Sequence, residues 1–167
     1  MAHETISADS HIVEPGDLWL TNIEPAFHDR APRLVRADDG DVFVCDGNRL
    51  AGVNMIGGAG KDPATAKRHA RLDEVRRGGW DPQARIKDMD VDGIKGEVLY
   101  PSVGLVLYRI EETDFLYACL RAYNTWLAEF CSHTTPIASE VWGWWRLRTR
   151  NVPSQNFTAS DAWASMA

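Results

Sequence analysis

Residues 81–102, DPQARIKDMDVDGIKGEVLYPS, constrain the fold most, because they read as a helix that leads directly into a strand. Asp81 followed by Pro82 suits the first turn of a helix, and Gly93 suits its end. Residues 96–102, GEVLYPS, read as a strand whose apolar run at 98–100 stops at a proline. A helix joined closely to a buried strand is typical of α/β proteins, so we predict an α/β fold.

Two other segments extend this pattern. Residues 5–9 read as a strand, and residues 111–133 contain the strongest helical signal in the chain. In that helix, apolar side chains recur at steps of three and four residues: Leu116, Leu120, Tyr123, Leu127 and Phe130. We expect its apolar face to pack on a sheet.

The connection between the first strand and the helix at residue 82 is unusually long. It spans about residues 16–80, whereas connections in βα units usually have about 2 to 6 residues. Residues 36–50 read as a small β-hairpin, and the glycines near Lys61 lack the spacing of a phosphate-binding loop. We therefore predict a long insertion after strand 1, which covers the fold as a lid and does not belong to its core.

Composition narrows the classes of partner. The chain has 167 residues, 44% of them hydrophobic and 25% charged, which suits one globular domain with a real core. A formal net charge of −6 argues against a nucleic acid or an anionic membrane as partner. Because the sequence lacks a signal peptide and an apolar run of about 20 residues, we expect a cytoplasmic protein with reduced cysteines.

The segment ISADSHIVEP, residues 6–15, contains the clearest candidate for chemistry. Residues two apart in a strand point to the same face, so Asp9 and His11 would present a carboxylate and an imidazole side by side. Such a pair is half of a metal site. The alternative is a surface pair or a polar cap at the end of the strand.

Two motifs together give the chain a resemblance to a known family. With ADSHIVEP at residues 8–15 and RIKDMDVDGIKGEVLYPSVGL at residues 85–105, it resembles the amidohydrolase-related (amidohydrolase 2) metal-dependent hydrolases. Within them it looks like the branch of the aminocarboxymuconate-semialdehyde and resorcylate decarboxylases. The resemblance covers roughly residues 5–133. It implies that residues 1–133 are the N-terminal part of a (β/α)8 TIM barrel, which is incomplete in this chain.

The resemblance also assigns roles to residues. Asp9 and His11 fall on the family's first pair of metal ligands, and the expected cofactor is a divalent ion, zinc or manganese, with the carboxylate favouring manganese slightly. Glu14 either supports the metal ligands from behind or is a plain loop acid. Tyr100 and Ser102 either line the substrate site or serve packing. The expected substrate is a small molecule that carries a carboxylate.

Residues 134–167 do not continue the family pattern. They hold four of the seven tryptophans and no lysine, and they show neither helical nor strand periodicity. Tryptophan and methionine have single codons, so part of the DNA sequence, and of its reading in a frame shifted by one base, follows from the protein sequence. In that frame the last base of each Trp codon joins the first two bases of the next codon, and the pairs Trp142–Gly143 and Trp163–Ala164 then specify glycine. The shifted frame gives a strand, an amphipathic helix and the start of another strand, so we predict an out-of-frame tail.

These observations predict a truncated metal-dependent hydrolase. Its intact relatives hydrolyse C–N or C–O bonds or decarboxylate their substrates, using a later His and Asp that this chain lacks. We expect weak or absent metal binding, no turnover and self-association through unpaired strands. The alternative is a non-catalytic interaction or structural module in which the aromatic tail forms a binding surface.

Overall fold

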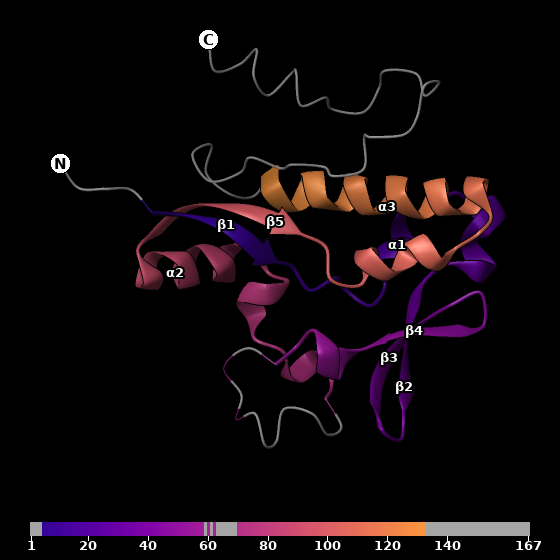
Figure 1. The fold of residues 1–167 in the computed structure, drawn as a ribbon, viewed down its shortest axis with the longest axis horizontal. Helices are drawn as coiled ribbons and strands as arrows, with labels where there is room; N and C mark the ends of the chain where they lie inside the picture. The colour runs from indigo at the N-terminus through magenta and orange to yellow at the C-terminus, as the bar shows by residue number, and fades with distance from the viewer. Residues whose placement is uncertain (1–4, 59, 61, 63–69, 133–167) are drawn as a thin grey trace, which may run out of the picture.

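The computed structural model describes residues 5–58, 60, 62 and 70–132 and confirms the mixed α/β class (Figure 1). The tail predicted at 134–167 lies outside the described residues. The strands are β1 (Thr5–His11), β2 (Arg33–Ala37), β3 (Gly40–Cys45), β4 (Asn48–Gly52) and β5 (Ile94–Tyr100), and the helices are α1 (Leu18–Asn22), α2 (Pro82–Asp92) and α3 (Thr113–Ser132). Short 3-10 turns lie at η1 (Pro25–Arg30), η2 (Val53–Met55), η3 (Leu72–Glu74), η4 (Arg77–Gly79) and η5 (Gly104–Arg109).

The predicted helix and strand at residues 81–102 are present as α2 and β5. The side chain of Asp81 accepts a hydrogen bond from the N–H of Ala84 at 2.9 Å, and Pro82 occupies the first turn. Gly93 ends the helix in the left-handed conformation, with φ 71°. β5 then pairs in parallel with β1. Both strands differ slightly from the predicted ranges: β1 runs two residues further, and β5 begins and ends two residues earlier.

The described residues of the insertion at 16–80 are folded. Its strands β2, β3 and β4 form an antiparallel sheet in that order, so the hairpin predicted at 36–50 is part of a three-stranded sheet. Asp46 and Gly47 connect β3 to β4, and both have positive φ, at 50° and 75°. That conformation matches the turn that favours Asp-Gly in tight hairpins.

The core lies where the insertion meets α3. Trp19 of α1 is fully buried, its Nε1–H donates to the carbonyl of Cys119 at 3.1 Å, and its ring meets the Phe43 ring edge-on at 6.1 Å. The prediction that the insertion covers the fold without belonging to its core is therefore wrong for these residues. α3 packs closely against α1 (Figure 1) and against η5. Its buried residues also share one hydrophobic cluster with Leu99 of β5 and Phe43 of β3, in agreement with the expectation that its apolar face packs on a sheet.

The parallel sheet is open in the part of the chain that the structure describes. It contains β1 and β5 alone, and most residues of β1 are exposed, including Ile6 at 67%. Parallel sheets are normally covered on both faces. The three cysteines, in contrast, are all buried and free, as expected for reduced structural thiols. No described helix has the length and apolar character needed to cross a membrane.

Candidate functional site

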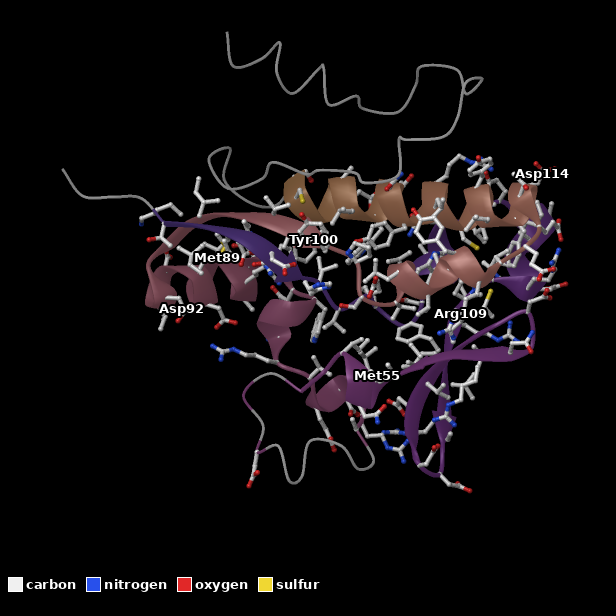
Figure 2. The ribbon with its side chains drawn as sticks, in the orientation of Figure 1. Met55, Met89, Asp92, Tyr100, Arg109 and Asp114 are labelled. Carbon is white, nitrogen blue, oxygen red and sulfur yellow. The ribbon has the colours of Figure 1, made fainter. Side chains whose placement is uncertain are left out.

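The candidate site lies at the C-terminal ends of β1 and β5. The parallel register pairs His11 with Tyr100, so the last residues of both strands meet at the same edge of the sheet. Figure 2 shows Tyr100 at the end of β5. Asp9 lies two residues before His11 on β1, and Ser102 lies two residues after Tyr100. The structure therefore brings the predicted site residues to one edge.

Hydrogen bonding determines which nitrogen of the neutral His11 imidazole carries the proton. Its Nδ1 lies 3.0 Å from the carbonyl oxygen of Pro101. A carbonyl can only accept a hydrogen bond, so Nδ1 carries the proton and Nε2 of the neutral ring keeps its lone pair. Nε2 lies 3.7 Å from Oδ1 of Asp9. The two side chains are 49% and 83% exposed, so the carboxylate of Asp9 and Nε2 of His11 lie together at a solvent-exposed position.

Tyr100 and Ser102 lie beside this pair. The Tyr100 ring centroid is 6.0 Å from that of His11, and the two rings are tilted by 37°. Ser102 is half-buried, and its backbone N–H donates to the carboxylate of Glu14 at 3.0 Å. Both positions agree with residues at the rim of a site. Their contact with a substrate stays a prediction.

Glu14 is fully buried below the loop that follows β5. It accepts hydrogen bonds from the backbone N–H groups of Ser102, Val103 and Gly104, at 3.0, 3.0 and 2.9 Å. Burial raises the pKa of Glu14, and these N–H groups oppose the rise by stabilising the carboxylate. Glu14 is thus bonded to the backbone of the neighbouring strand end and is no solvated loop acid.

A second polar network supports β1 and was missed in the sequence. Arg85 of α2 forms an ion pair with Glu97 of β5, and both side chains are about nine-tenths buried. Arg85 Nη1 also donates to the His11 carbonyl at 3.2 Å, and Ser10 Oγ donates to Glu97 at 3.2 Å. The sequence held one signal for this pair: Glu97 interrupts an apolar strand, and Arg85 lies on the preceding helix, one turn before Met89. A charged side chain in a buried strand needs a partner of opposite charge.

The described residues hold no cluster of three or more His, Cys, Asp or Glu side chains that could bind a metal ion. Asp9 and His11 are therefore a pair, whereas zinc sites usually have three or four protein ligands. Their donor atoms suit a divalent ion, since a carboxylate oxygen and an imidazole nitrogen are the usual ligands of zinc and manganese.

No protein-family model and no curated protein matches this chain. Among solved structures, it is similar to the crystal structure of the amidohydrolase map2389c from Mycobacterium avium subsp. paratuberculosis K-10, with a TM-score of 0.61 and 21% sequence identity. The match covers 83% of this chain and 42% of that protein, so this chain spans less than half of its length. The comparison shows an amidohydrolase-like fold.

Proposed function

We propose that this chain is the N-terminal part of a metal-dependent hydrolase related to the amidohydrolases, with Asp9 and His11 as half of its metal site. The observation that carries the proposal is the position of this pair. An acidic and an imidazole ligand lie together at the C-terminal end of a parallel strand, where barrel enzymes hold their active sites. The amidohydrolase-like fold supports the same assignment.

His11 and Asp9 would hold the metal through Nε2 and the carboxylate. The Pro101 carbonyl accepts from Nδ1, so in the neutral ring the lone pair that would bind the metal lies on Nε2, on the side of Asp9. A bound zinc or manganese ion would activate water or orient the carboxylate of a small substrate. Tyr100 and Ser102 would line the substrate site, and either hydrolysis or decarboxylation would follow from the groups contributed by later strands.

The remaining ligands would come from polypeptide beyond this part of the barrel. In the family that the sequence resembles, these are a later His and an Asp. We propose that residues 134–167 are read out of frame and that the chain alone lacks turnover. Two ligands give a weak site, and the described residues add no further parallel strand that could supply a base. The nucleotide sequence from Cys131 onward tests the frame directly: immediate stop codons in the shifted frame would contradict it.

Metal content tests the half-site. We expect the purified chain to hold well under one equivalent of zinc or manganese by elemental analysis, and titrations to show weak binding that His11→Ala removes. The matched control is His28→Ala, because His28 also faces an aspartate, Asp29, with Nδ1 3.9 Å from Oδ1, and is similarly exposed. Equal losses in both variants would refute the assignment. Stoichiometric metal that depends on His11 would instead show that the chain completes its own site.

A non-catalytic interaction module is the second candidate. The open parallel sheet favours it, because β1 and β5 present unpaired edges in the described part of the chain and Ile6 is largely exposed. The two candidates differ in the effect expected of His11→Ala. A module needs no metal, so its association with a partner would be unchanged by His11→Ala.

A further inference from the structure

We infer that Glu14 is a positioning residue, which holds the Pro101 carbonyl and through it the imidazole of His11. The role of that imidazole as a metal ligand rests on the proposed function. The positioning itself does not, because it concerns only contacts within this chain. Glu14 belongs to the segment after β1, whereas the groups that it holds follow β5.

One side chain ties the two strand ends together. The carboxylate of Glu14 is inaccessible to solvent and accepts three backbone N–H groups in succession: Oε1 accepts from Ser102 and Gly104, and Oε2 accepts from Val103. Burying a carboxylate costs free energy, and three directed donors offset that cost only in one arrangement of the loop. The three amides therefore fix the path of residues 102–104.

This path determines where the Pro101 carbonyl points. Pro101 immediately precedes the first amide held by Glu14, and it is buried. The loop folds back tightly on it, since a Cβ added at Gly104 would lie 2.7 Å from Cβ of Pro101. On the other side, the N–H of Ile12 donates to the Tyr100 carbonyl at 3.0 Å. The peptide that carries the Pro101 carbonyl is thus held from both sides.

The direction of that carbonyl decides which nitrogen of His11 is protonated. Nδ1 donates to it at 3.0 Å, which leaves Nε2 free on the side of Asp9. A histidine side chain free in water prefers the proton on Nε2. If the loop at 102–104 shifted, His11 would lose its acceptor, and the proton would move to the nitrogen that faces Asp9.

The tautomer of His11 is the direct readout. We would label the histidines of the full chain with 15N and record magic-angle-spinning spectra at pH 8, where an ordinary imidazole is neutral; sedimented protein suffices, so association does not prevent the measurement. The His11 signals are assigned by their absence in His11→Gln. We expect the Nδ1–H tautomer in the wild type and a mixture dominated by Nε2–H in Glu14→Ala. Glu14→Gln, which keeps the shape and one acceptor oxygen, should give an intermediate mixture.

The control is a buried carboxylate elsewhere. Asp41 is 7% exposed and also accepts a backbone N–H, that of Leu72 at 3.0 Å. Asp41→Asn should leave the tautomer of His11 unchanged, which separates positioning from general loss of stability. The inference is overturned if the wild type shows Nε2–H, if both Glu14 variants keep Nδ1–H, or if Asp41→Asn shifts the tautomer equally.

Metal binding provides a second readout that tests the link to the proposed function. With zinc or manganese chloride as the titrant, Glu14→Gln should weaken binding about 10- to 100-fold relative to the wild type, the range typical of residues that orient a ligand. A change of tautomer without any metal binding in the wild type would confirm the positioning and contradict the weak metal binding expected of the half-site. Unchanged affinity in a variant with altered tautomer would contradict the role of Nε2.

Discussion

Glu14 and Asp41 are the two most deeply buried carboxylates among the described residues, and they respond to pH in opposite directions. Burial raises the pKa of Glu14, so its ionisation costs stability as the pH rises through and above the unfolded value of about 4.3. Burial acts in the same sense on Asp41, but the N–H of Leu72 and the guanidinium of Arg71 outweigh it and lower the pKa. Asp41 therefore stabilises the fold when ionised.

Asp41→Asn should destabilise the insertion. Arg71 Nη1 lies 2.9 Å from Oδ1 of Asp41, and the substitution leaves this guanidinium without its carboxylate partner, at a cost of about 1–3 kcal/mol. The contribution of Asp41 is present above its unfolded pKa of about 3.9 and is lost as the pH falls through its lower folded value. We expect the urea midpoint, followed by tryptophan fluorescence, to fall in the variant at pH 6 and to converge with the wild type towards pH 2.

The same pH series tests whether the carboxylate of Asp41 causes the loss of stability in acid. If the wild type and Asp41→Asn lose stability in parallel as the pH falls, the carboxylate of Asp41 does not carry the acid sensitivity. Glu14→Gln serves as a contrast, because removing a carboxyl group with a raised pKa should not reduce the loss at low pH.

Elements with local signals were predictable, and elements that depend on tertiary contacts were not. α2 could be predicted because Asp81, Pro82 and Gly93 mark its ends within the sequence itself. α1 has five residues, too few for a visible period, and it exists because Trp19 packs under α3 and bonds to Cys119, one hundred residues away. For the same reason, the sequence did not reveal that the insertion supplies part of the core.

Gly93→Ala tests the end of α2. Gly93 has φ 71° and a Cβ added there meets no atom within 4 Å, so the whole cost is the left-handed backbone conformation, about 1 kcal/mol. We expect faster amide hydrogen exchange in α2 and in the start of β5. Gly47→Ala is the matched control, because Gly47 has φ 75° in equally open space but belongs to the β3–β4 turn. Faster exchange in the same segments for both variants would contradict the local explanation.

At the scale of the whole molecule, the sequence predicted only those parts of the candidate site whose residues are close together in the chain. Asp9 and His11 could be paired from their spacing, since alternate residues of a strand share a face. The bonds from Glu14 to residues 102–104 span 88 to 90 positions, and no pattern in the sequence encodes them. The TIM barrel remains a prediction: the fold is amidohydrolase-like, and the chain covers 42% of the similar protein.

The open parallel sheet leads to the last prediction, on association. Among the described residues, β1 and β5 have strand edges without partners, and Ile6 of β1 is an exposed apolar side chain. Both features favour pairing with another molecule, so the chain should form oligomers and bind a hydrophobic dye. Ile6→Lys places a charge on β1 at a residue that is 67% exposed, and it should reduce both effects without a large loss of stability. Light scattering after size-exclusion chromatography measures the change in mass.

Met55→Lys distinguishes the sheet from apolar exposure in general. Met55 is 76% exposed, more than Ile6, but it lies in the η2 turn, away from β1 and β5 (Figure 2). If the unpaired sheet drives association, Met55→Lys leaves the mass distribution and dye binding unchanged. An equal effect of both lysine substitutions would show that exposed apolar side chains in general drive association. A wild-type monomer with one sharp cooperative melt would mean that β1 and β5 need no further strands. A two-stranded parallel sheet is rarely stable unless other elements pack on its faces. We therefore expect the wild type to associate, and Ile6→Lys to reduce association more than Met55→Lys does.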